Sequence, residues 1–286
     1  MTRPTLLLLA FTLALSAQRP KLIDAHVHYN GDPAFLTQYT QKLKAANGRA
    51  LLIAESKHVP VVTEFMARNP GLLYGLGQMS LDHPDALKLV DDFHNAGFRG
   101  LGELTGPEAD YHDKRYWPIY ERAEKYGMII LFHTGIVNRR NFAEPMNVSS
   151  DRMRITTLDL IARRFPKLTI IAAHMGNPDY AWAAEVGRWN PNLFFDVSGS
   201  TLYKKQHDLA SFKSIFWWDN LVSPHTPKTD VSAFEKLVFG SDVFGNNLDE
   251  FDRALDLYKR MLEACGVRPA SQDNIFSGNL WKVLNK

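Results

Sequence analysis

Short apolar segments of strand length alternate with longer amphipathic segments along most of this chain. In residues 85–96, for example, Leu87, Val90 and Phe93 recur at helical spacing, and Gly97 follows directly. Similar patterns predict helices at residues 113–126, 150–165 and 248–264. Eight apolar segments predict strands, at residues 22–28, 50–54, 72–79, 98–104, 128–133, 168–174, 193–197 and 237–242.

Eight successive strand-then-helix units favour a single α/β domain, a TIM (β/α)8 barrel. A doubly wound parallel sheet shares the same alternation and is the alternative fold. The number of units, together with the polar residues at the strand ends, favours the barrel. Residues 200–236 show no clean helical pattern, so we expect a distorted barrel with a long insertion after the seventh strand.

The first residues differ in pattern from the rest of the chain. An almost wholly apolar run from Thr5 to Leu15 follows one positive charge, and the small residues Ser16 and Ala17 come next. This layout is typical of a secretory signal peptide, and the run is short for a membrane-spanning helix. We expect removal of residues 1–17, with the cleavage site left open, and export of residues 18–286 to the periplasm or medium without stable membrane insertion. A buried N-terminal helix is the alternative.

Composition narrows the class of protein. Of the 286 residues, 45% are hydrophobic and 22% are charged, which is ordinary for a globular protein. The formal net charge is +2, from 33 basic and 31 acidic residues, and no block of like charge is present. Charge therefore gives no support to a nucleic-acid or membrane-surface partner. The single Cys265 excludes an internal disulfide and a cysteine-rich metal site.

The five residues 24–28, Asp-Ala-His-Val-His, end the first predicted strand. Because side chains alternate along a strand, His26 and His28 are expected to point the same way and to hold one metal ion. Asp24 has the same parity, so we expect it one layer deeper inside the barrel, where it could orient a ligand from behind. The apolar residues of this strand are expected on the other face, against helices: Ile23, Ala25 and Val27.

Three later strands end in residues that can also bind a metal. His133 follows the fifth predicted strand, His174 ends the sixth, and Asp242 ends the eighth. Each follows an apolar run and has a glycine close by. A lone histidine at such a position is usually a packed core residue, but five such residues on four strands are hard to explain by packing. Since barrel enzymes have their sites at the carboxyl ends of the strands, these residues predict a catalytic metal centre.

This set of motifs resembles the amidohydrolase superfamily, and most closely its amidohydrolase-2 branch. The likeness extends to the last helix, where residues 273–280 read Asp-Asn-Ile-Phe-Ser-Gly-Asn-Leu. The resemblance implies that one divalent metal ion, most often zinc, is held by four residues and that His174 acts on the substrate beside it. The implied ligands are His26, His28, His133 and Asp242.

Three imidazoles and a carboxylate suit zinc, although ligand type alone leaves nickel, cobalt, iron and manganese open. Such an ion could activate a water molecule. Asp242 could take the proton of that water and pass it to the leaving group, while His174 polarises a carbonyl oxygen. A metal site that only stabilises the fold is the alternative, but structural sites are usually closed.

Glu103, near the end of the fourth strand, could bridge a second metal ion, as a glutamate does in the related deoxyribonuclease branch. Contact with substrate or with a neighbouring strand is the alternative role of this carboxylate. Other residues could bind the substrate from the loops after the fifth and seventh strands. These are Arg139, Arg140, Trp217, Trp218 and His225.

The resemblance and the residues together predict a metal-dependent hydrolase of a small-molecule ester, lactone or amide. A zinc-dependent decarboxylase of an aromatic or muconate-like acid is the first alternative, because some members of the branch carry out that reaction. A binuclear phosphodiester hydrolase is the second, if Glu103 supports two metals. A homodimer would be unsurprising for this family.

Overall fold

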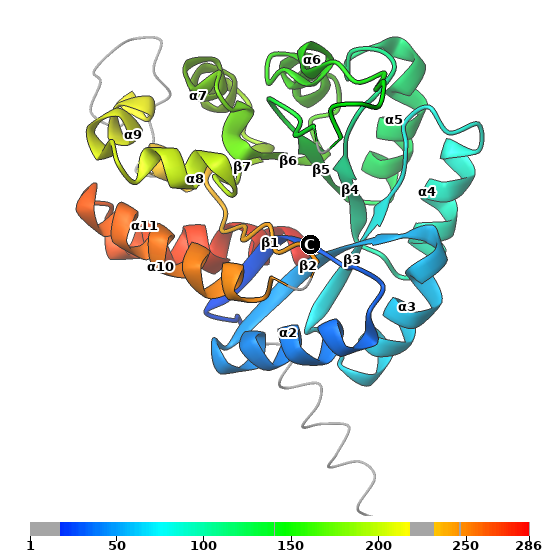
Figure 1. The fold of residues 1–286 in the computed structure, drawn as a ribbon, viewed down its shortest axis with the longest axis horizontal. Helices are drawn as coiled ribbons and strands as arrows, with labels where there is room; N and C mark the ends of the chain where they lie inside the picture. Colours follow the sequence, from blue (N-terminus) through cyan, green and yellow to red (C-terminus); the bar gives the residue numbers. More distant parts are fainter. Residues whose placement is uncertain (1–17, 140, 218–231, 246, 286) are drawn as a thin grey trace, which may run out of the picture.

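Seven parallel strands lie side by side in chain order, from β1 to β7, in the computed structural model of this chain. The structure describes residues 18–139, 141–217, 232–245 and 247–285, so the predicted signal segment lies outside it. Helices surround the strands in a ring (Figure 1). The strands are β1 (Leu22–His28), β2 (Gly48–Glu55), β3 (Leu73–Gln78), β4 (Gly100–Leu104), β5 (Ile129–His133), β6 (Thr169–Ala173) and β7 (Leu193–Phe195). Seven of the predicted strands are therefore confirmed.

Residues 237–243 take the place of the eighth strand and close the barrel between β7 and β1. A parallel bridge joins Leu237 to Phe195 of β7, and another joins Val243 to Val27 of β1. With the closing segment in place, the seven-stranded sheet curls into a distorted barrel, as the sequence predicts.

The prediction of a regular eighth strand is wrong, because two backbone N–H groups of this segment do not donate to a neighbouring strand. The N–H of Phe239 donates to the carbonyl oxygen of Ile275 at 3.1 Å, and that of Ser241 donates to Asp24 Oδ1 at 2.9 Å. Asp242 then has a φ of 57°, in the left-handed region, which ends the extended backbone. A side chain that replaces a strand partner leaves no mark in the hydropathy pattern, so this interruption was not predictable.

The helices that cover the strands are α2 (Pro33–Ala45), α3 (Val59–Arg68), α4 (Ala86–Asn95), α5 (Trp117–Lys125), α6 (Thr157–Arg164), α7 (Tyr180–Trp189) and α10 (Asp249–Ala264). Single 3-10 turns lie at Ser56–His58, Lys114–Tyr116, Ser150–Met153, His174–Gly176 and Ala233–Lys236. The helix predicted at residues 150–165 is interrupted, since Arg154 is extended with a ψ of 144°. No helix in the described part of the chain is long and apolar enough to cross a membrane.

We expected no regular helix in residues 200–236, and this expectation is wrong for the first part of the segment. The first part of this segment forms α8 (Ser200–Lys205) and α9 (Leu209–Ile215). Asp208 caps α9 by accepting a hydrogen bond from the backbone N–H of Ser211 at 3.0 Å. Both helices are shorter than the window in which an apolar periodicity can be recognised, which explains the missed assignment.

Strand β1 contains a bulge that changes which way its side chains point. Asp24 pairs with Ala50 of β2 and Val27 pairs with Leu52, so three steps along β1 face two steps along β2. An extra residue of this kind breaks the strict alternation of side chains. Val27 packs against the helices, as expected, and His26 and His28 reach the site.

The bulge leaves Asp24 on the helix side of β1, and the prediction that it points into the barrel is wrong. The hydroxyl of Tyr39, on α2, donates to Asp24 Oδ2 at 2.8 Å, and the hydroxyl of Ser241 donates to the same oxygen at 2.5 Å. Burial raises the pKa of Asp24 to about 6, although these hydrogen bonds act in the opposite direction. Ile23 and Ala25, expected against the helices, lie instead in the cluster that fills the barrel interior.

The C-terminal segment closes the floor of the barrel, as its resemblance to a closing helix suggested. It consists of α11 (Pro269–Asp273), a π-helical turn (Asn274–Gly278) and α12 (Asn279–Leu284). Leu280 and Leu284 of α12 pack into the interior cluster. The hydroxyl of Ser277 donates to the carbonyl oxygen of Pro20 at 2.6 Å, just before β1 begins.

Candidate metal centre

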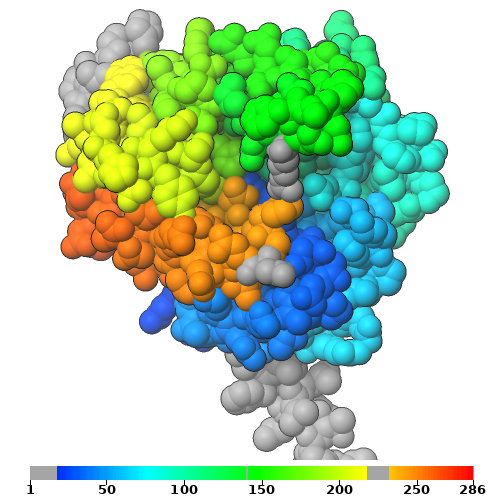
Figure 2. All heavy atoms as spheres, in the orientation of Figure 1, coloured from blue at the N-terminus to red at the C-terminus, as the bar shows by residue number. Residues whose placement is uncertain are grey.

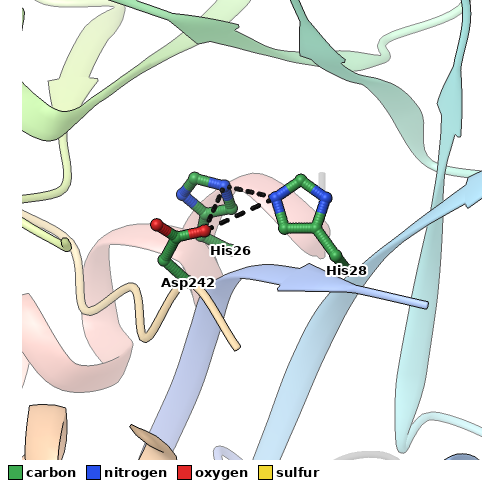
Figure 3. A group of neighbouring side chains, drawn as sticks. All are labelled: His26, His28 and Asp242. Carbon is green, nitrogen blue, oxygen red and sulfur yellow. Dashed lines mark hydrogen bonds and ion pairs between the residues drawn. The ribbon is translucent and has the colours of Figure 1, made fainter. Parts of the chain in front are cut away.

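Two histidines of β1 and the aspartate of the closing segment bring their ligand atoms together (Figure 3). His26 Nε2 lies 3.0 Å from His28 Nε2, and each of these nitrogens lies 3.5 Å from Asp242 Oδ1. His26 is fully buried, whereas Asp242 keeps 27% of its side chain exposed. Their spacing is compatible with a single metal ion. Three of the four predicted ligands therefore lie together.

The fourth predicted ligand, His133, lies in a neighbouring group with Glu103 and His174. His133 Nδ1 donates to Glu103 Oε1 at 2.9 Å, and His174 Nε2 lies 3.5 Å from the same oxygen. The other oxygen, Glu103 Oε2, lies 3.8 Å from His26 Nε2 and 3.7 Å from His28 Nε2. Glu103 therefore stands between the two groups.

Asp196, which is not among the predicted site residues, contacts one histidine of each group. It follows β7 and is fully buried. Its Oδ2 lies 3.0 Å from His26 Nδ1, and its Oδ1 accepts from the backbone N–H of His174 at 3.1 Å. The hydroxyl of Ser198 donates to Asp196 Oδ1 at 2.6 Å and lies 3.1 Å from His174 Nδ1. The sequence contains a sign of this position, since Asp196 follows an apolar run and Gly199 comes soon after, as at the other strand ends.

Three carboxylates, two of them buried, keep their charge among these histidines. Burial raises the pKa of Asp196, but the charge of His26 and its hydrogen bond lower that pKa to about 2. Burial also opposes ionisation of Glu103, yet the charge of His26 and the hydrogen bonds of the histidines hold its pKa well below the usual range. Burial has the same effect on Asp242, but the charge of His26 and the hydrogen bond of His28 lower its pKa.

The carboxylates in turn favour the charged form of two histidines. Burial lowers the pKa of His26, but Asp242, Asp196 and Glu103 raise it well above its ordinary value. Burial also lowers the pKa of His174, yet the hydrogen bond and charge of Glu103 raise it to about 9. The cluster therefore requires positive charge between its carboxylates, and either protons or a bound metal ion can supply that charge.

The donor chemistry fits a metal ion. Because the ionised carboxylate of Asp196 only accepts, His26 Nδ1 carries the hydrogen, and a neutral His26 presents the lone pair of Nε2 to the site. His133 Nε2 is buried and has no hydrogen-bond partner among the described residues. Such an orphaned lone pair is costly unless a cation fills it. Imidazole nitrogens with carboxylate oxygens are the ligands that zinc and similar ions prefer.

Unusual backbone conformations place two of the side chains. Asp242 has a φ of 57° and His174 a φ of 60°, and residues other than glycine are held in this region at a cost of about 1 kcal/mol or more. Gly199 leaves room between them, because a Cβ there would lie 3.3 Å from Asp242 Oδ2 and 3.4 Å from His174 Nδ1. Strain at Asp242 and His174 is consistent with a functional site.

Both groups open into a cavity of ≈ 840 Å³, a volume suited to a small molecule. The loop between β5 and α6 forms one wall of this cavity. Phe244, which follows the closing segment, also lines it, and its ring centroid lies 5.4 Å from that of His28. Figure 2 shows the green part of the chain, which includes this loop, and the orange part, which follows the closing segment, on the same face of the molecule.

Two of the predicted substrate-binding residues are described, and neither lines the cavity. Arg139 lies in the loop after β5, but its guanidinium donates to three backbone carbonyl oxygens within residues 141–144. Trp217 packs against Arg188, whose guanidinium carbon lies 4.8 Å from the ring centroid. Three further candidates lie outside the described residues: Arg140, Trp218 and His225.

Comparison with known proteins decides the family. A family model described as Amidohydrolase matches residues 23–285, nearly the whole described chain. The chain belongs to this amidohydrolase family. The resemblance inferred from the strand-end motifs is thereby confirmed, while no curated protein matches the chain.

Solved structures similar to this amidohydrolase confirm the TIM-barrel fold. An uncharacterized TIM-barrel protein from Bordetella bronchiseptica has a TM-score of 0.63 at 15% identity, covering 92% of this chain and 98% of its own. A probable 2-pyrone-4,6-dicarboxylic acid hydrolase from Acinetobacter baumannii, solved with citric acid bound, has a TM-score of 0.59 at 14% identity, covering 93% and 100%. A TatD homologue from Escherichia coli has a TM-score of 0.50 at 15% identity, covering 90% and 98%.

Proposed function

We propose that this amidohydrolase is a metal-dependent hydrolase that cleaves a small-molecule ester, lactone or amide. The observation that carries the proposal is the convergence of His26 Nε2, His28 Nε2 and Asp242 Oδ1 within 3.5 Å at the edge of a cavity. Three ligand atoms this close together can share one metal ion, and the adjoining cavity gives a substrate access. The description of one structural neighbour as a probable pyrone hydrolase supports the reaction class, since a pyrone is a cyclic ester.

One divalent ion, proposed to be zinc, would be held by His26, His28 and Asp242, with His133 as the fourth ligand that the family resemblance implies. When bound, such an ion supplies Lewis-acid chemistry, which activates water and polarises a carbonyl group. Asp196 fixes the orientation of His26 through its hydrogen bond to Nδ1.

The chain itself supplies a base and a hydrogen-bond donor to the proposed reaction. Asp242 is ionised and partly exposed to the cavity, so it can accept a proton from the attacking water and return it to the leaving group. His174 Nδ1 lies 3.2 Å from the carbonyl oxygen of Ser198, an acceptor only, so this nitrogen carries a hydrogen. In its protonated form, which Glu103 favours by raising the pKa of His174 to about 9 against the effect of burial, His174 also carries a hydrogen on Nε2 and can donate it to the carbonyl oxygen of a substrate.

Metal removal tests the proposal. Purified protein is expected to contain about one divalent ion per chain, because one group of three ligands is complete with His133 beside it. Dialysis against a strong chelator should abolish hydrolysis of lactones and esters, and adding back zinc should restore it. The checks are elemental analysis and activity on the same samples. Full activity in metal-free protein would refute the proposed function.

Decarboxylation is the competing reaction, since metal dependence is common to both. Incorporation of ¹⁸O from labelled water into the product is expected for a hydrolase. Release of carbon dioxide from aromatic carboxylates without such incorporation would decide for the lyase.

A binuclear phosphodiester hydrolase remains the second candidate because of one observation. Glu103, His133 and His174 form a second group with metal-binding spacing, beside the first. Two ions per chain, with turnover of a phosphodiester such as bis(4-nitrophenyl) phosphate, would favour this function over carbonyl hydrolysis.

We also propose that the enzyme is exported, on the strength of the apolar run and small residues within residues 1–17. Protein isolated from its native host is expected to begin near Gln18. N-terminal sequencing checks this, and a start at Met1 would overturn cleavage.

A further inference from the structure

Away from the metal centre, the described lining of the cavity is largely uncharged and partly apolar. Amide and hydroxyl side chains supply most of its polar groups: Gln78, Thr105, Asn138, Asn141, Asn177 and Ser200. Such groups offer hydrogen bonds without charge. The described lining contains no Lys or Arg, and its one ionisable residue beyond the two metal-binding groups is an acid, Glu144.

Two described basic residues near the cavity form hydrogen bonds to other groups of the protein. The guanidinium of Arg139 donates its hydrogen bonds to backbone carbonyl oxygens of its own loop. Lys204 Nζ donates to Asn177 Oδ1 at 3.1 Å, so this lysine lies behind a lining residue and not in the wall itself. A substrate with several carboxylates would therefore meet Glu144 and find, among the described residues, no guanidinium or ammonium group in the wall.

Three exposed apolar side chains border the same cavity. Ile136 is 62% exposed, Met146 is 49% exposed and Phe244 is 51% exposed, and all three line the cavity. Ile136 and Met146 come from the loop after β5, and Phe244 comes from the segment that follows Asp242. Apolar side chains that are gathered beside a polar centre are typical of a binding site for an apolar group.

We propose that the substrate is an uncharged lactone or ester with an apolar substituent, which binds against Ile136, Met146 and Phe244. This inference rests on the proposed function, and it separates the enzyme from hydrolases of polycarboxylate substrates. The neutral amides can bind uncharged oxygens of the substrate, while the apolar residues remove its substituent from water.

Matched lactones test the proposal. δ-Hexanolactone and δ-nonanolactone share the ring and the secondary leaving group and differ by three methylene groups. At about 0.8 kcal/mol for each buried methylene, zinc-loaded enzyme should show a kcat/KM at least about tenfold higher for δ-nonanolactone. A δ-nonanolactone analogue whose terminal methyl is replaced by a carboxylate should fall at least about tenfold below its parent. Equal values for the two lactones, or a preference for the carboxylate analogue, would overturn the proposal.

Variants test which residues cause the preference for the apolar substrate. Met146→Arg should lower the ratio of δ-nonanolactone to carboxylate analogue by about tenfold or more, because it replaces apolar surface by a cation. Leu160→Arg is the matched control, since Leu160 is an exposed apolar residue on α6 and lies outside the cavity lining. This control should leave the ratio unchanged. A ratio that is the same in Met146→Arg and wild type would contradict the assigned subsite.

A binding measurement separates this inference from the proposed function. 3-Butylcyclohexanone and 3-methylcyclohexanone have a methylene group in place of the ring oxygen of the two lactones, so they cannot be hydrolysed, and calorimetry with zinc-loaded protein gives their affinities without turnover. The butyl compound should bind about tenfold more tightly or better. Tighter binding without hydrolysis of any lactone would overturn the proposed reaction and keep the subsite. Hydrolysis of the lactones with equal binding of the two ketones would keep the reaction and overturn the subsite.

Discussion

Asp242→Asn is expected to lower kcat/KM by about 10³-fold, the largest effect of any single substitution considered for this protein. The amide keeps the shape and one oxygen of the side chain, but it cannot accept the proton that the ionised carboxylate takes. General acid–base groups contribute about 10² to 10⁴ in rate, and loss of a charged ligand adds to that. The measurement is steady-state hydrolysis together with the metal content of the variant.

Asp256→Asn is the matched control for this substitution. Asp256 lies on the outer face of α10, where it pairs with Arg260 at 2.8 Å, and it should leave both activity and metal content unchanged. An Asp242→Asn enzyme that retains its metal and loses turnover would support the proton-transfer role. Near-wild-type turnover with full metal content would refute that role.

Asp196→Asn is expected to weaken metal binding by about 10- to 100-fold, the usual effect of losing the carboxylate behind a metal-binding histidine. The ionised carboxylate of Asp196 accepts from His26 Nδ1 and so presents Nε2 to the metal centre. An amide at this position can offer its NH₂ group to Nδ1 and stabilise the wrong tautomer. Competition with a metal-chelating dye gives the affinity, and circular dichroism confirms that the variant is folded.

Ser198→Ala provides the graded comparison. It removes a hydroxyl that donates to Asp196 Oδ1 at 2.6 Å, but it leaves the contact between Asp196 and His26 in place. Metal affinity should therefore change by less than about threefold, whereas hydrolysis should fall because Ser198 Oγ also contacts His174. Wild-type metal affinity in Asp196→Asn would show that His26 does not depend on this carboxylate.

The sequence predicts much of this site because the barrel imposes a simple rule. Carboxyl ends of parallel strands meet at one rim, so His26, His28, His133, His174 and Asp242 could be placed together from their positions after apolar runs. Hydropathy could not reveal the bulge in β1, because an extra residue in a fully buried strand changes no residue class. Asp24 therefore lies against α2 and not inside the barrel.

The role of Asp196 was not predicted for a different reason. It lies within the apolar segment predicted as residues 193–197, where it reads as part of a strand and not as its end. The strand ends at Phe195, and the acid that follows turns toward His26. The absence of Lys and Arg from the described lining was also not predictable, because nothing in the sequence shows that the guanidinium of Arg139 binds its own loop.

The contact between Ser277 and Pro20 fixes where the chain enters the barrel. Strand β1 starts beside α12 at the floor, and the cavity opens at the other end of the same strand. A fusion partner or surface linker joined ahead of residue 18 therefore leaves from the side opposite the entrance. Immobilised through its N-terminus, the enzyme would keep its entrance facing the solution.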